Sequence, residues 1–130
     1  MFTVVRFSSP REAKATMASI GRKINEFIPG KFVDSDLGDG GFSVSICEMP
    51  DWHNHQSEIE LFLESCGKIF LEAASSGLSV SFDVAIEPED LVDKPLVSCF
   101  CDFEFLARLS DFKVSLEFSF YNPNYGEESR

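Results

Sequence analysis

Alternation of apolar and small polar residues is the feature that most constrains the fold of this chain. In the stretch LSVSFDVAI (residues 78–86) every second residue is apolar, and mostly small or polar residues separate them. Successive side chains of a strand point to opposite faces, so this segment predicts a strand with one buried face. FSVSICE (42–48) and KVSLEFSFY (113–121) have the same pattern. A sheet of such strands is covered by helices on one side only.

Two longer segments have the apolar spacing of helices. Residues 10–28 predict the first helix: Pro10 suits the first helical position, and Ser9, directly before it, suits the N-cap. Apolar residues then recur every three or four positions, as they also do over residues 51–76. Gly67 lies inside the second helix, where glycine costs about 1 kcal/mol relative to alanine. Close packing against a neighbour would explain it.

The other segments complete the order of elements. Residues 2–7 predict a first strand, PLVSCFC (95–101) a short strand, and residues 102–109 a short helix capped by Asp102. The order β-α-β-α-β-β-α-β predicts an α+β fold: a two-layer sandwich whose largely antiparallel sheet of about five strands has two main helices and one short helix on one face. We expect a single α+β domain over residues 1–121 and a flexible C-terminal tail over residues 122–130.

Serines recur on the opposite, open face of this predicted sheet. They are Ser43, Ser45, Ser79, Ser81, Ser115 and Ser119. Two interpretations are open: serine solvates the outside of the sheet, or its hydroxyl groups make the face a docking surface.

The net charge of −11 is distributed unevenly along the chain. Residues 1–33 carry six Lys or Arg and two acidic residues, a net charge of +4, whereas the remaining residues carry five basic and twenty acidic ones, a net charge of −15. Such a field repels nucleic acid and membrane phosphates and attracts a basic protein. The alternative is that acidity only keeps the protein soluble. No signal peptide or membrane span is evident, so we expect a cytoplasmic protein whose four cysteines are reduced.

The stretch VDSDLGDGGF (33–42) raises the question of a calcium site. If Asp34 is position one of an EF-hand loop, Gly38 occupies a ligand position and Asp39 stands where glycine is needed. Ser45 then replaces the bidentate glutamate. The segment therefore does not match the EF-hand motif, and its glycines predict an exposed acidic turn that precedes the strand at Phe42.

Other patterns typical of metal sites or catalysis are weak. His53 and His55 point about 200° apart on a helix, and Cys99 with Cys101 lacks a second well-spaced cysteine pair. Adding Cys47 and a histidine would complete a possible zinc site, but free thiols are the favoured interpretation. The sequence contains no motif of a catalytic nucleophile, of a phosphate-binding loop or of a dinucleotide-binding site. We therefore predict no cofactor, no metal and no enzymatic activity.

The C-terminal run CDFEFLARLSDFKVSLEFSFY (101–121), preceded by an amphipathic helix and the strand GLSVSFDVAI (77–86), resembles a small bacterial domain family of unknown function. Many members of that family lie in polymorphic-toxin loci, where they look like immunity proteins of the contact-dependent growth inhibition type. The resemblance covers residues 2–121 and is one of pattern, so it assigns no functional residues.

Charge and resemblance together predict an immunity protein. It would bind a cognate, basic toxin domain, such as a nuclease, and block the active site of that toxin. It would bind neither nucleic acid directly nor a membrane. The candidate contact residues are acidic, with one possible aromatic anchor; they are Asp34, Asp36, Asp39, Glu87, Glu89, Asp90, Asp93 and Trp52. The alternatives are a small-ligand or regulatory binding module, and an acidic nucleic-acid mimic that inhibits a host or defence enzyme.

Overall fold

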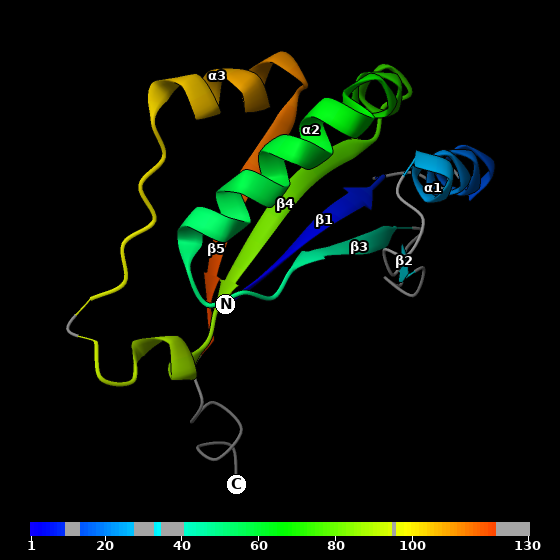
Figure 1. Cartoon of the computed structure of the whole chain (residues 1–130). Coiled ribbons are helices and arrows are strands. Elements are labelled where there is room, and N and C mark those ends of the chain that lie inside the picture. Colours follow the sequence, from blue (N-terminus) through cyan, green and yellow to red (C-terminus); the bar gives the residue numbers. More distant parts are fainter. Residues whose placement is uncertain (10–13, 28–32, 35–40, 95, 122–130) are drawn as a thin grey trace, which may run out of the picture.

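The computed structural model describes all residues except 10–13, 28–32, 35–40, 95 and 122–130. In chain order its elements are β1 (Phe2–Ser8), α1 (Lys14–Phe27), β2 (Val33–Asp34), β3 (Phe42–Cys47), α2 (Trp52–Ser75), β4 (Ser79–Ile86), the 3-10 helix η1 (Pro88–Leu91), α3 (Phe103–Asp111) and β5 (Val114–Phe120) (Figure 1). The predicted α+β class is confirmed. The predicted tail lies outside the described residues.

One mixed sheet organises the molecule. Its strand order is β2-β3-β1-β4-β5. The pairs β2–β3, β3–β1 and β1–β4 are antiparallel, and β4–β5 is parallel. A parallel neighbour requires the chain to return to the end of the sheet where β4 began. The segment 87–113, which contains η1 and α3, makes this return.

The prediction of a strand over residues 95–101 is wrong. The described part of this segment, residues 96–101, contains no strand and forms part of the connection to α3. Its side chains nevertheless alternate: Leu96 and Phe100 are exposed, whereas Val97 and Cys99 are half-buried. One side of this segment packs on the core without a partner strand, which explains the strand-like pattern. The fifth strand is instead the two-residue β2.

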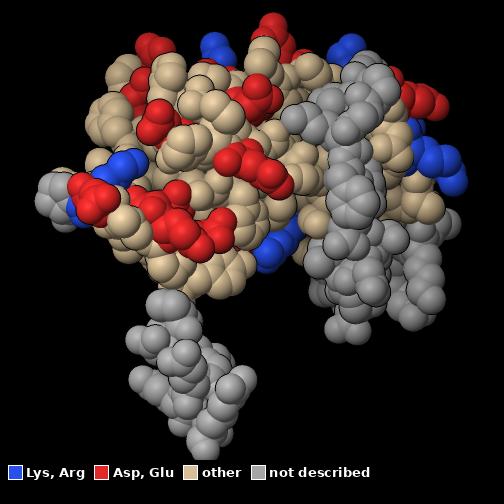
Figure 2. Space-filling view, turned by 60° about the horizontal axis from the view of Figure 1, so that its bottom comes forward, with Lys and Arg blue, Asp and Glu red and all other residues tan. Residues whose placement is uncertain are grey.

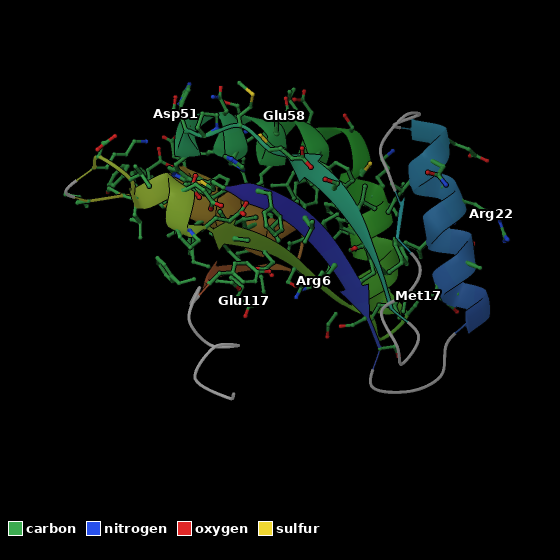
Figure 3. All side chains as sticks on the ribbon, turned by 90° about the horizontal axis from the view of Figure 1, so that it is seen from below. Arg6, Met17, Arg22, Asp51, Glu58 and Glu117 are labelled. Atoms are coloured by element: carbon green, nitrogen blue, oxygen red, sulfur yellow. The ribbon has the colours of Figure 1, made fainter. Side chains whose placement is uncertain are left out.

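The core lies between the sheet and the helices α1 and α2, which cover the same face (Figure 1). Its centre is an aromatic cluster. Phe70 of α2 is fully buried, and its ring lies 5.6 Å from Phe62, 5.7 Å from Phe7 and 6.0 Å from Phe82, centroid to centroid. In α1, Met17 is turned toward this core and Arg22 away from it (Figure 3).

The glycine inside α2 is explained by close packing. A Cβ atom on Gly67 would lie 2.3 Å from Cε1 of Phe112, the residue that follows α3. Real Cβ atoms do not approach that closely, so the ring of Phe112 uses the space left by the missing side chain. Gly67 therefore allows the C-terminal end of α3 to pack against α2.

The second face of the sheet is not covered by α1 or α2 and carries a polar network. Arg6 and Glu117 lie on this side, away from α2 (Figure 3). The Asp83 carboxylate is almost fully buried there; it pairs with the Arg6 guanidinium at 3.1 Å and accepts a hydrogen bond from the Ser119 hydroxyl at 2.8 Å. Ser119 is thus part of a network within the sheet rather than only a solvated side chain.

Within the described ranges, no helix combines the length and the apolar character that are needed to cross a membrane.

Candidate interaction surface

Acidic side chains gather where β4 leads into η1. Glu89 and Asp93 are exposed and Glu87 is half-buried, and Figure 2 shows a cluster of acidic groups at this end together with others spread over the same face. The segment holds one basic residue, Lys94. Acidic groups therefore outnumber basic ones at this end, which gives it a net negative charge.

Asp90, a predicted contact residue, has its carboxylate engaged inside the molecule. It accepts hydrogen bonds from the Met1 ammonium group at 2.6 Å and from the Glu87 amide at 2.8 Å. Burial alone would raise the pKa of the Asp90 carboxyl group. The hydrogen bonds from Met1 and Glu87, together with the positive charges of Met1 and Lys94, outweigh burial, so the pKa is lowered. Asp90 thus ties η1 to the start of β1.

Exposed apolar side chains lie among these acids. Leu91 is the last residue of η1 and Val92 follows it; both are exposed, as is Leu96 a few residues later. The amide of Tyr121 donates to the carbonyl of Ile86, which brings the C-terminal end of β5 beside the start of η1. Phe120, at this end of β5, is 71% exposed. We call this surface the acidic end; it consists of Glu87, Glu89, Leu91, Val92, Asp93, Leu96, Phe120 and Tyr121.

A second group of exposed aromatic residues flanks the start of α3. Phe100 is 75% and Phe103 is 80% exposed, and Leu106 on the outer side of α3 is also exposed. The inner side of the helix is formed by Phe105 and Leu109, which are buried. Since α3 is apolar on two sides, it has more apolar surface than the core of this chain uses.

The predicted acidic residues are only partly brought together. Asp34 lies in β2, where it pairs in register with Ser43, at the opposite edge of the sheet from β5. Asp36 and Asp39 lie outside the described residues. Asp34 and the acidic end therefore lie at opposite edges of the sheet rather than in one site (Figure 1).

Trp52 is a core residue rather than an exposed anchor. Its side chain is buried, and the indole N–H donates to the carbonyl of Phe100 at 2.8 Å. Its ring lies edge-on to Phe105 and tilted against Phe118. Trp52 thus fixes the connection 96–102 against α2, and it indirectly positions the exposed Phe100.

The histidines and cysteines do not form a metal site in the described part of the chain, where no group of three or more His, Cys, Asp or Glu has the required arrangement. His53 is exposed, whereas His55 is buried. Cys47 and Cys66 are buried free thiols, and burial raises the pKa of Cys66 to about 11, which keeps it protonated and unreactive.

The buried His55 of α2 joins β1 to the segment that follows β3. Its Nε2–H donates to the carbonyl of Met49, which can only accept, so Nδ1 of the neutral ring accepts from the Thr3 hydroxyl at 2.7 Å. Burial is the largest cause that lowers the pKa of His55, and the Met49 carbonyl and Asp90 oppose it only in part. The folded protein therefore holds a neutral imidazole.

We expect the protein to lose stability as the pH falls from about 7 to about 5.5. The unfolded chain protonates His55 near its ordinary pKa of about 6.5, whereas the folded protein does so only at a lower pH. In that window the unfolded state binds more protons, so protonation favours unfolding. Urea unfolding at the two pH values measures the effect. His55→Gln should flatten the pH dependence; an unchanged slope in His55→Gln would contradict this assignment.

The grooves that the described residues line are open to solvent. One of them, about 610 Å³, runs between α3 and β5 and is lined in part by Leu106, Leu109, Val114 and Leu116. A smaller one of about 140 Å³ lies between Trp52 and Leu96. Open grooves of this kind suit an extended protein segment better than an enclosed small ligand.

Sequence reasoning missed the exposed apolar residues. The alternation over residues 113–121 predicts a buried Phe120, but the helical layer ends before this residue and leaves it uncovered. Phe103 and Leu106 carried a usable signal, because they lie on the opposite side of a short helix from Phe105 and Leu109.

No protein-family model, curated protein or solved structure gives a significant match to this chain.

Proposed function

We propose that this chain is an immunity-type inhibitor, a non-catalytic cytoplasmic protein that binds a basic toxin domain and blocks its active site. The observation that carries the proposal is the acidic end, where exposed carboxylates and exposed apolar side chains occupy one surface. Stable protein interfaces combine an apolar centre with a polar rim, and charge complementarity speeds encounter.

The type of partner follows from charge. A nuclease presents lysine and arginine to attract phosphates, so an acidic protein competes directly with its substrate. The net charge of −11 supports this choice, as does the resemblance to domains found in polymorphic-toxin loci. The exposed Glu89 and Asp93 would contact the basic groups, with Val92 and Phe120 in the apolar centre.

The test is direct binding to the product of the adjacent upstream gene. We expect the two proteins to co-purify and the affinity to fall as salt concentration rises. Reversing two charges of the acidic end, in Glu89→Lys with Asp93→Lys, should weaken binding on the order of tenfold.

A matched control carries Glu58→Lys with Glu64→Lys, which changes the net charge equally but on α2. This control should lose much less affinity. Absence of binding to the neighbouring product would refute the proposed function, and equal losses in the two double variants would refute the acidic end as its contact surface.

A further inference from the structure

β5 presents an unpaired edge. The sheet order ends at β5, and no described strand pairs with its outer side. The amide of Tyr121, which continues β5, points to β4 and donates to Ile86. Backbone groups of a strand alternate in direction, so those of the even-numbered residues point away from β4. The outward-pointing donors and acceptors, which no described strand pairs, belong to Val114, Leu116, Phe118 and Phe120, and we call this row the β5 edge.

Within β5 itself the usual protection of an edge strand is missing, although Lys113 directly precedes it. Natural edges carry proline, lysine or a bulge that prevents another strand from pairing. Between Val114 and Phe120 there is neither proline nor lysine, and the register with β4 is regular over all seven residues. The β5 edge therefore has the geometry to accept a further strand.

The helix α3 provides a side wall for such a strand. The groove of about 610 Å³ lies between α3 and the first half of β5, with Leu106 and Leu109 on the helix and Val114 and Leu116 on the strand. In Figure 1, α3 overhangs the sheet at the side where β5 ends it. Side chains of an added strand that point to the helical face would enter this groove.

We propose that the β5 edge binds an extended segment of the partner protein as a sixth strand, antiparallel to β5. The segment has apolar residues at alternate positions, which face α3, and a lysine or arginine opposite Glu117, which is exposed on the other face. This inference rests on the proposed function in taking a basic protein as the partner.

A second copy of the chain fits the edge less well. Antiparallel pairing over the full length of β5 is centred on Glu117 and places this carboxylate opposite its own copy, in a molecule that already carries a net charge of −11. Registers centred nearer Val114 would bring two α3 helices over the same stretch of strand. A basic segment meets neither obstacle.

Hydrogen exchange followed by NMR tests the proposal with synthetic peptides. The probe is the heptapeptide acetyl-TVKVKVT-amide, and the control is the same peptide with N-methylated valines, whose lost N–H groups would have pointed to β5. We expect the probe to slow amide exchange of Leu116 and Phe118 at least about tenfold. Ser115 and Glu117, already bonded toward β4, should not change, and the N-methylated peptide should have no effect.

Charge reversal tests the recognition of the basic residue. Glu117→Lys should weaken binding of the lysine probe and favour acetyl-TVEVEVT-amide. The control is Glu48→Lys, which changes the net charge equally. Because Glu48 lies just after β3, away from β5, this substitution should leave peptide binding unchanged.

Three results would overturn the proposal: no protection of Leu116 and Phe118 at millimolar probe, equal protection by the N-methylated peptide, or a dimer that protects these amides without peptide. The outcome is separable from that of the proposed function. If the neighbouring gene product binds but leaves exchange of Leu116 and Phe118 unchanged, strand addition fails while the inhibitor role stands.

Discussion

Replacing Phe70 by alanine is expected to lower the free energy of unfolding by about 3–5 kcal/mol. Phe70 is fully buried in α2, and its ring contacts Phe7, Phe62 and Phe82. The substitution removes the burial of a large ring, leaves a cavity beneath α2 and breaks three aromatic contacts. Because small domains are stable by only about 5–15 kcal/mol, a large fraction of the molecules would unfold under mild denaturant.

Urea unfolding monitored by circular dichroism measures the change. The neighbouring residue provides the control, since Leu71 is 37% exposed on the same helix and Leu71→Ala should cost less than about 1 kcal/mol. Phe70→Leu keeps much of the side-chain volume, so its loss in the free energy of unfolding should lie between those of Phe70→Ala and Leu71→Ala. Similar losses in Phe70→Ala and Leu71→Ala would show that the aromatic cluster is not the centre of the core.

The elements with strong periodicity were predictable from the sequence. The predicted strands at 78–86 and 113–121 correspond to β4 and β5, and the predicted helix at 51–76 corresponds to α2. In each, a period of two or of about 3.6 places the apolar residues on one face, and burial of that face then selects the element.

The pairing of the strands and the extent of the helical layer above the sheet were not predictable from periodicity. The parallel arrangement of β4 and β5 depends on which strand lies beside which, and residues 95–101 alternate although no strand pairs with them. The exposure of Phe120 depends on where the helices end above the sheet, which periodicity does not contain.

The candidate surface was predictable in its charge but not in its details. Glu87, Glu89 and Asp93 follow the strongest strand signal, so an acidic loop after β4 was expected. The bond between Asp90 and Met1 joins residues 89 positions apart, and the burial of Trp52 depends on Phe100, Phe105 and Phe118. Local patterns carry no information about such distant contacts.

Removal of the Asp83 carboxylate should cost about 2–3 kcal/mol of stability. Asp83 is 4% exposed, pairs with Arg6 and accepts from Ser119 on the face of the sheet away from α2. In Asp83→Ala both partners lose this acceptor, and Nε of Arg6 is already buried without a hydrogen bond. The Arg6 side chain is 43% exposed, so solvent reduces the loss below the roughly 3–5 kcal/mol of a fully buried pair.

A double-mutant cycle with Arg6→Ala isolates the pair, because the double variant should lose less stability than the sum of the two single variants. Asp83→Asn retains an oxygen for Ser119 and should cost less than Asp83→Ala. Glu117 is the matched control: it is acidic, exposed on the same face and in register with Asp83 across β4 and β5, so Glu117→Ala should change stability by no more than about 0.5 kcal/mol. If Asp83→Ala were as mild as Glu117→Ala in urea unfolding, the Arg6–Asp83–Ser119 network would not stabilise the sheet.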